Sequence, residues 1–459
     1  MARKIPWRTP RRVRHAVALA ALALAACGGG GGDDGVLPPL PGVTCSTAEQ
    51  RLWLDDYFDA WYFWYRLAPD PNPLREMTVA EFFEASLYTG GDVRFPRDRW
   101  SYLESSEDFD RFFGDGRLLG YGVYLAGIET DRDPARPLLV RYVEPQSDAA
   151  ARGVRRGDEV VSVNGRPAAE IVAADDYAAF TPDDEGQALA LVLRNGGVER
   201  SVTLRASAFA LTPVTLARVL QTPMGRRMGY LHVKDMIDQA EPALDRSFAD
   251  FRAAGITELV IDLRYNGGGL VSLSRRLASY VNGARTRDQV YARLLFNDRR
   301  ARDENETFRF EPPSSALNLS RVYLLTGPRT CSASELVING LRPFVEVVAI
   351  GDTTCGKPVG FRPVSRCDTT FNVVNFESVN GRDEGRYFDG FAPTCAVTED
   401  FSRPLGTLEE PLLAAAGTHA DGGSCPAGTG GVARQRPMGA GAPRLRGGEP
   451  PERQGMWRR

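Results

Sequence analysis

Residues 258–269 read ELVIDLRYNGGG, a run of aliphatic residues that ends at three consecutive glycines. A short apolar run bounded by turn residues is typical of a buried strand. From Met228 to about Gly417, further strand-like runs alternate with runs that fit helices. We predict strands at 229–233, 258–263, 321–325 and 345–350, and helices at 242–254, 272–281 and 333–341. This alternation favours a layered α/β domain.

The stretch before this domain, from about residue 118 to 204, alternates apolar and polar positions between turns rich in Gly and Asp, which predicts a small β-rich module. Within it, residues 147–165 read SDAAARGVRRGDEVVSVNG. This segment closely resembles the signature of PDZ domains, which hold a chain's terminal carboxylate on backbone N–H groups and add the peptide to a sheet edge. Because glycine lets a backbone approach a ligand closely, we place the carboxylate loop at residues 119–123. Its candidate substrate-binding residues are Gly120, Tyr121, Gly122 and Val123.

The two ends of the globular region have distinct compositions. From Cys45 to about Tyr102 the sequence is rich in aromatic residues spaced by three and four, which predicts an amphipathic helix that packs on the main body rather than a ligand-binding aromatic box. After Cys425 the chain is rich in Gly, Pro and Arg with almost no aliphatic residues. We predict that this tail is disordered.

The N-terminus is typical of an export signal. A basic stretch is followed by the apolar run Ala16 to Ala26, which is too short to span a bilayer as a helix. The run ends in LAACG, which resembles the bacterial lipoprotein box and implies that Cys27 is acylated; the alternative is a plain secretory signal. We therefore expect a lipid-anchored, periplasm-facing protein of the cell envelope, at the outer membrane of a Gram-negative bacterium, on a flexible tether.

Net charge and cysteine content limit the partners. The formal charge is -3, and residues 1–26 carry six basic residues and no acid, so their removal leaves -3 - 6 = -9. A chain with this net negative charge and no nucleic-acid motif is not expected to bind nucleic acid.

Apart from Cys27 there are six cysteines, which in an exported protein suggest up to three disulfides in any of 15 pairings. None shows zinc-ligand spacing, and we expect no metal and no cofactor.

Two segments carry features of acyl-transfer chemistry. The three glycines at 267–269 leave backbone N–H groups available to a developing oxyanion, although such a run also fits a tight turn or a phosphate loop. Residues 330–335 read TCSASE, between a predicted strand and a predicted helix. Ser332 and Glu335 have capping-box spacing, so Ser332 could simply cap the helix. A serine at a helix N-terminus also lies in positive potential, which favours an alkoxide.

The third segment, 351–358, reads GDTTCGKP and contains Lys357. The chain has only three lysines among 56 basic residues, the others being Lys4 and Lys234. In so arginine-rich a sequence, a lysine indicates a site that needs an amine able to lose its proton, although a chance surface lysine is the alternative.

A Ser-His-Asp triad is the rival way to activate Ser332, and the histidines disfavour it. His15 leaves with the signal, His232 lies in a strand pattern, and His419 lies beyond the last good helix. We therefore predict Ser332 as the nucleophile and Lys357, with a pKa lowered by desolvation, as its general base.

Here the chain resembles a known family. The order PDZ, D-L-R-x-N-G-G-G, S-A-S-E, G-x-x-x-x-G-K resembles the carboxyl-terminal processing (tail-specific) serine proteases of peptidase family S41, particularly their lipoprotein members. In that family the first serine of S-A-S-E is the nucleophile and the lysine follows 25 positions later, as Lys357 follows Ser332 (357 - 332 = 25). The resemblance also implies that the oxyanion donors are the backbone N–H groups of Ala333 and of a glycine, Gly268 or Gly267.

The resemblance implies a multi-domain α/β and β fold with a layered, ClpP/crotonase-like protease core. The expected segments are a signal peptide at 1–26, a tether at 27–44, a helical domain at 45–115, a PDZ domain at 116–207, the core at 208–425 and the tail at 426–459. Two positions depart from the family pattern. Phe361 stands where many relatives have glutamine, and Pro343 stands where some have aspartate.

The expected activity is that of a serine endopeptidase which cuts exported proteins at or near their C-termini, with the substrate tail held by the PDZ domain. The alternatives are an inactive PDZ-type peptide-binding lipoprotein and an acyl-processing enzyme of another kind. Because the dyad brings its flanking cysteines together, we expect a Cys331–Cys355 disulfide, with Cys367–Cys395 and Cys45–Cys425 as the remaining pairs.

Overall fold

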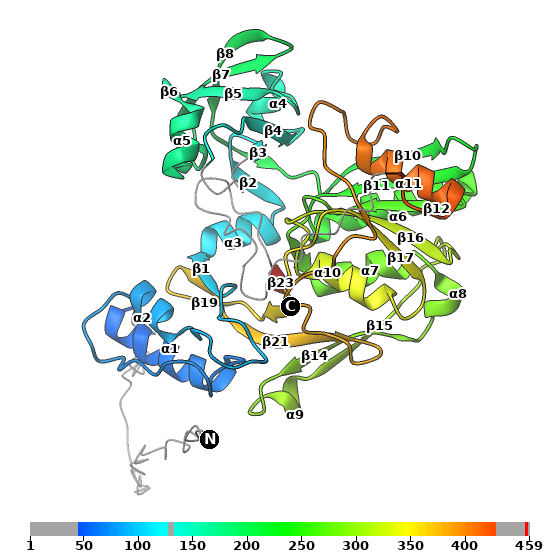
Figure 1. Cartoon of the computed structure of the whole chain (residues 1–459). Coiled ribbons are helices and arrows are strands. Elements are labelled where there is room, and N and C mark those ends of the chain that lie inside the picture. Colours follow the sequence, from blue (N-terminus) through cyan, green and yellow to red (C-terminus); the bar gives the residue numbers. More distant parts are fainter. Residues whose placement is uncertain (1–44, 127–132, 428–454, 458–459) are drawn as a thin grey trace, which may run out of the picture.

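The computed structural model describes residues 45–126, 133–427 and 455–457 (Figure 1). The expected signal, Cys27 and the tether lie outside the described residues. No helix within the described ranges has both the length and the apolar character needed to cross a bilayer.

The centre of the fold is a six-stranded sheet in the order β10-β11-β12-β16-β17-β22, in which every pair is parallel except β10 and β11. Its strands are β10 (Val214–Gln221), β11 (Arg227–Val233), β12 (Glu258–Asp262), β16 (Arg321–Thr326), β17 (Glu346–Gly351) and β22 (Cys395–Ala396). Alternate strand residues enter two different core clusters, one on each face. The helices α6 (Glu241–Ala254), α7 (Val271–Ser279) and α10 (Ala333–Leu341) contribute to one cluster, and α11 (Pro411–Gly422) contributes to the other. The predicted mixed α/β class is confirmed.

Every strand and helix predicted from residue 229 to residue 350 is present, with ends displaced by no more than two residues. The predicted helix 333–341 has the bounds of α10. These elements were predictable because the strands are continuous aliphatic runs buried on both faces, and the helices carry a clear apolar stripe.

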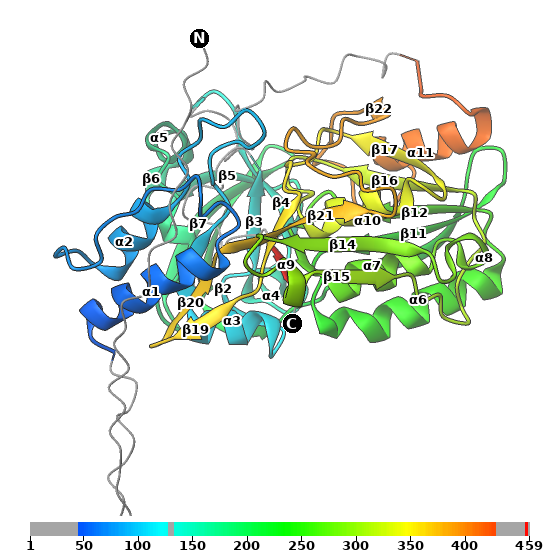
Figure 2. The same ribbon diagram turned by 90° about the horizontal axis from the view of Figure 1, so that it is seen from below.

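A second sheet has the order β13-β23-β18-β21-β14-β15, and α10 lies between it and β17 of the first sheet (Figure 2). Its strands are β13 (Gly268–Leu270), β23 (Gly455–Trp457), β18 (Val359–Phe361), β21 (Val374–Asn380), β14 (Val290–Phe296) and β15 (Glu306–Arg309). The short helices α8 (Gly283–Thr286) and α9 (Ala301–Glu304) flank β14 in the chain. The expectation of a wholly disordered tail is wrong for residues 455–457, which form a strand of this sheet.

A third sheet, β3-β4-β5-β7-β8, has a hydrophobic core of its own. Its strands are β3 (Val123–Ala126), β4 (Leu138–Val143), β5 (Glu159–Val163), β7 (Ala188–Asn195) and β8 (Val198–Arg205), and β6 (Arg166–Pro167) pairs with β5. The helices α4 (Asp148–Ala151) and α5 (Ala168–Ala174) pack with it, and β2 (Arg117–Gly120) pairs with β9 (Ser207–Ala210). Asn164 (φ 50°) and Gly165 (φ 80°) form the two-residue turn between β5 and β6, a turn for which an Asn-Gly pair is favoured.

The N-terminal region contains α1 (Thr47–Trp61), α2 (Val79–Ser86), β1 (Tyr102–Ser105) and α3 (Ser106–Phe113). Strand β1 pairs with β20 (Thr369–Asn372), which pairs with β19 (Val364–Arg366). The buried aromatic residues of α1 and its following loop, among them Phe58, Tyr62 and Trp64, belong to the same core cluster as α6, α7 and α10. The aromatic stripe therefore packs on the main body.

Three disulfides join the described cysteines: Cys331–Cys355, Cys45–Cys367 and Cys395–Cys425. The predicted Cys331–Cys355 bridge is confirmed, with 5.1 Å between the Cα atoms. The other two predicted pairings, Cys367–Cys395 and Cys45–Cys425, are wrong. Trp53 of α1 packs against Phe371 and Arg366, which brings the start of the described chain near Cys367. The cluster around α11 brings Cys425 to Cys395.

Candidate active site

Ser332 lies in the turn between β16 and α10 and is completely buried. Its backbone has φ 58° and ψ -113°, a conformation that a residue with a Cβ rarely adopts. Such strain costs on the order of 1–3 kcal/mol and collects at functional sites. Its Oγ makes no hydrogen bond within the described part of the chain, so this hydroxyl is not used to cap α10. The turn resembles the strained strand-to-helix turn that presents a nucleophilic serine.

Glu335, one turn into α10, is also completely buried and joins two segments. Its Oε2 accepts the backbone N–H groups of Ser332, at 2.9 Å, and of Lys357, at 2.8 Å. Its Oε1 accepts the Gly356 N–H at 2.8 Å and the hydroxyl of Thr354. Burial raises the pKa of Glu335, and these hydrogen bonds act in the opposite direction. One carboxylate thus fixes the backbone of Ser332 relative to that of Lys357.

Lys357 follows this loop and has no exposed surface. Burial lowers the pKa of its amine well below the ordinary lysine value, although the carboxylates of Asp98 and Glu335 act to raise it. The Nζ atom lies 3.9 Å from the centroid of the Phe361 ring, the position that departs from the family pattern. The ring covers the amine with apolar surface. An amine in this environment is neutral at a lower pH than an exposed lysine, as a general base requires.

The glycine segment after β12 is tied to the turn that carries Ser332. The Asn266 carbonyl accepts the Cys331 N–H at 3.1 Å and the Ser334 hydroxyl at 3.0 Å. Asn266 Oδ1 accepts the Gly268 N–H at 2.9 Å, so this predicted oxyanion donor already has an acceptor. At Gly269 (φ 137°), an added Cβ would lie 2.1 Å from the Met236 carbonyl oxygen, which explains the requirement for glycine there.

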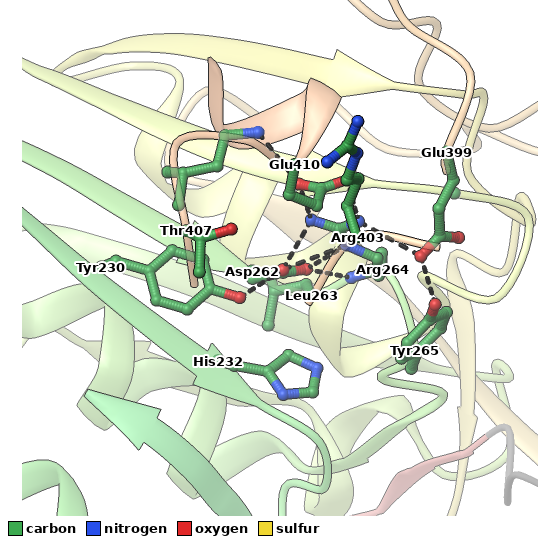
Figure 3. A network of polar contacts seen from close by, with 12 residues as sticks. Tyr230, His232, Asp262, Leu263, Arg264, Tyr265, Glu399, Arg403, Thr407 and Glu410 are labelled. Atoms are coloured by element: carbon green, nitrogen blue, oxygen red, sulfur yellow. Dashed lines mark hydrogen bonds and ion pairs between the residues drawn. The ribbon is translucent and has the colours of Figure 1, made fainter. Parts of the chain in front are cut away.

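Arg264, two residues before Asn266, is the centre of a network of buried ion pairs (Figure 3). Its guanidinium makes a bidentate pair with Glu410, at 2.8 and 2.9 Å, and bonds Asp262 at 2.9 Å. Burial opposes its charge, yet these carboxylates hold the Arg264 pKa well above its ordinary value. The D-L-R part of the motif therefore serves to fix the loop against the N-terminus of α11, where Glu410 is the cap.

The predicted carboxylate loop lies between β2, which ends at Gly120, and β3, which begins at Val123. Tyr121 is buried, and its carbonyl accepts the Ala149 N–H at 3.2 Å. At Gly122 (φ 78°), an added Cβ would lie 2.0 Å from the Ser147 Cβ, so only glycine fits. The loop is thus held by the residues around α4, on a sheet other than the two that hold Ser332 and Lys357.

The described histidines lie in other surroundings. His232 is buried in β11, and burial lowers its pKa to about 4; its Nδ1 contacts the hydroxyl of Thr215. His419 lies in α11 with its Nδ1 3.4 Å from the Tyr323 hydroxyl. Cys331, Glu335 and Cys355 have ligand atoms close enough to hold a metal ion, but the two sulfur atoms are bonded to each other. This cluster is therefore not a metal site.

Sequence reasoning gave Glu335 only a capping role and did not single out Asp98 or Glu410. The S-x-x-E spacing was the one signal for Glu335, because it places this residue in the first turn of the helix beside Ser332. Asp98 could not have been found, since it is brought near Lys357 only by the packing of the N-terminal region. The structure places Pro343 just beyond α10, where its carbonyl accepts a bond from Arg382 at 3.0 Å.

In comparisons with known proteins, this chain is similar to peptidases. Residues 227–393 match peptidase family S41. The chain is 24% identical over 296 residues to the carboxy-terminal processing protease CtpB of Bacillus subtilis (strain 168), covering 62% of this chain and 58% of that protein. It is 24% identical over 247 residues to the chloroplastic carboxyl-terminal-processing peptidase 2 of Arabidopsis thaliana, covering 53% and 46%. The chain thus spans about half the length of these curated relatives.

Two solved structures share the fold. One from Bacteroides fragilis NCTC 9343, described as a candidate S41 protease, is 26% identical with a TM-score of 0.62, covering 81% of this chain and 97% of that one. The photosystem II D1 C-terminal processing protease is 18% identical with a TM-score of 0.51, covering 82% and 98%. The second likeness supports the fold alone.

The contacts of Glu335 yield a prediction. Glu335→Gln would turn an NH2 group toward backbone N–H donors, and each buried donor left without an acceptor costs about 1–3 kcal/mol. We expect the free energy of unfolding to fall by about 2–5 kcal/mol, measured by urea denaturation, together with slower labelling of Ser332 by a fluorophosphonate. The exposed Glu346→Gln is the matched control. Wild-type stability and labelling of Glu335→Gln would show that this carboxylate does not hold the two segments.

Proposed function

We propose that this chain, which belongs to peptidase family S41 through residues 227–393, is a serine endopeptidase that acts on proteins, with Ser332 as nucleophile and Lys357 as general base. The observation that carries the proposal is the shared anchorage of the two residues. Their backbone N–H groups bond the same Glu335 oxygen, and the Cys331–Cys355 bridge joins their flanks. The burial of the amine supports a base that is neutral when it must accept a proton.

In the proposed reaction, Lys357 Nζ takes the proton of Ser332 Oγ as this oxygen attacks the substrate carbonyl carbon. The tetrahedral intermediate then collapses: the C–N bond breaks, the lysine returns the proton to the leaving amine, and an ester remains on Ser332. Water, deprotonated by the same amine, hydrolyses the ester. Because the base must be neutral, kcat/KM should rise with pH as Lys357 loses its proton, and should fall on acidification below its lowered pKa.

The oxyanion would be held by backbone N–H groups. Ala333 is the first residue of α10, where the helix dipole adds positive potential. The Gly268 N–H donates to Asn266 Oδ1, so this group would have to exchange that acceptor for the substrate oxygen; Gly267 is the neighbouring alternative. Removal of one such donor typically costs about 10²–10³ in kcat.

We further propose that the β3–β8 sheet is a PDZ domain that recruits substrate C-termini. In the described part of the sheet, β3 is the terminal strand, so a peptide could add along its outer edge next to Gly120, Tyr121, Gly122 and Val123. Arg156 from this sheet bonds Tyr265 at 2.6 Å and Glu399 at 2.8 Å, which joins the module to the network around Arg264. Capture of a C-terminus would thus occur on a unit in direct contact with the catalytic domain.

The alternative is an inactive peptide-binding lipoprotein that uses the same sheet edge. The strained, unbonded Ser332 favours the enzyme, because a binding protein has no use for such strain. We also propose that Cys27 carries lipid and anchors the protein, facing the periplasm, in the cell envelope.

The dyad is tested by substitution. Ser332→Ala, Lys357→Ala and Lys357→Arg should each lower kcat/KM for a protein with an apolar C-terminus by at least about 10⁴-fold, since nucleophile and base act as a unit. The exposed Ser320→Ala should retain wild-type activity, and circular dichroism checks that each variant is folded. Substantial activity in Lys357→Arg would rule out the lysine as a base, because arginine keeps its proton.

The anchor is tested by phase separation in a nonionic detergent. Wild-type protein made in a Gram-negative host should enter the detergent phase, whereas Cys27→Ser should enter the aqueous phase, because it lacks the acylated side chain. Wild-type protein in the aqueous phase would contradict the lipid anchor without affecting the proposed catalysis.

A further inference from the structure

One inner strand of the second sheet comes from residues 455–457, far along the chain from its neighbours in the sheet. Strand β23, residues 455–457, lies between β13 and β18 and is hydrogen-bonded to both. Hydrogen-bonded strands lie about 4.8 Å apart, so β13 and β18 are separated by about 9–10 Å, the width of one inserted strand. Without β23, the two would not be neighbours in a sheet. The fold thus contains a slot that fits one extended chain.

Strand β23 pairs along its whole length with β13 and through one residue pair with β18. Strand β23 runs parallel to β13, with Gly455, Met456 and Trp457 opposite Gly268, Gly269 and Leu270. It also runs parallel to β18, where Trp457 is opposite Phe361. On its other side β13 forms a bridge through Gly269 to Met236, and Leu270 donates its N–H to the Met236 carbonyl at 2.9 Å. The slot wall is therefore held in place independently of the tail.

The slot lies among the three segments assigned to catalysis. Strand β13 is the glycine segment itself, and β18 begins two residues after Lys357. Helix α10, which begins directly after Ser332, packs against β23, and Figure 1 shows the red strand at the centre of the molecule beside α10. A chain in this position runs along the nucleophile's helix with its backbone engaged from both sides, as a peptide substrate must be before it is cut.

We propose that the slot between β13 and β18 is the binding site for the extended substrate chain, and that residues 455–457 of the same molecule occupy it in the resting protein and compete with substrate. The competition with substrate rests on the proposed function, whereas the occupancy of the slot by residues 455–457 does not. Strand addition is held together by main-chain hydrogen bonds, so the backbone of residues 455–457 can occupy the same slot as the backbone of a substrate. The tail is a tethered competitor with an effective concentration that can reach the millimolar range.

The first experiment measures competition. Deletion of residues 455–459, or Met456→Pro, which removes an N–H from the strand, should raise kcat/KM for a protein substrate at least about fivefold. Met438→Pro makes the same change in the same tail outside β23 and should leave kcat/KM unchanged. Equal rates for wild type, deletion and Met456→Pro would overturn the competition.

The second experiment measures occupancy without catalysis. In a Ser332→Ala background, the synthetic peptide QGMWRR, residues 454–459, is titrated into the tail-deleted and the full-length protein by calorimetry. We expect the peptide to bind the tail-deleted protein and to bind the full-length protein at least about tenfold more weakly, with no change on tenfold dilution of the protein.

Equal affinity for both proteins, or no binding to either, would overturn the occupancy of the slot by residues 455–457. If the full-length protein bound the peptide more tightly after dilution, the tail in the slot would come from a second copy of the chain. That result would overturn the intramolecular assignment. If the enzyme proposal alone fails, proteolysis is absent from all variants while the peptide still distinguishes the two chains.

Discussion

The structure around the candidate site depends on one buried carboxylate. Glu335 accepts hydrogen bonds from the backbone N–H groups of Ser332, Gly356 and Lys357 and from the hydroxyl of Thr354. Replacing Glu335 is costly, because its four donors would then be buried without an acceptor and without water to bond. The disulfide beside it holds the same two segments covalently. The relative position of the proposed nucleophile and the proposed base is therefore set by backbone contacts.

The electrostatic setting of Lys357 comes from a different part of the chain. The N-terminal region packs into the same core as α10 and brings Asp98, which bonds Tyr62 at 2.7 Å and Ser101 at 2.6 Å, near the amine. Phe361 covers the amine with an aromatic ring where many relatives of the family have glutamine. A ring has no amide oxygen to accept a hydrogen bond from the amine, and its face attracts the charged form of the amine. The lowered pKa of Lys357 therefore comes from its burial. The departure at 361 is thus compatible with a lysine base.

Much of this arrangement was predictable from sequence, and the exceptions have a common cause. The strands and helices from residue 229 to residue 350 and the Cys331–Cys355 bridge follow from local pattern and from the spacing of motifs. The Cys45–Cys367 disulfide, the approach of Asp98 and the strand at 455–457 depend on contacts between segments far apart in the chain. The tail's composition predicted disorder because it cannot bury a core of its own; it forms a strand because the slot supplies hydrogen-bonding partners on both sides.

The central claim is that Lys357 is a neutral base at the pH of catalysis, and the titration of this one amine tests it most directly. With three lysines in the whole sequence, protein labelled with ¹³C at lysine Cε gives few signals, and Lys357→Arg identifies the one from Lys357. The account predicts that this signal titrates well below the ordinary lysine value, because the amine is completely buried. A Lys357 signal that titrates at about 10.4 or above, as an exposed lysine does, would contradict it.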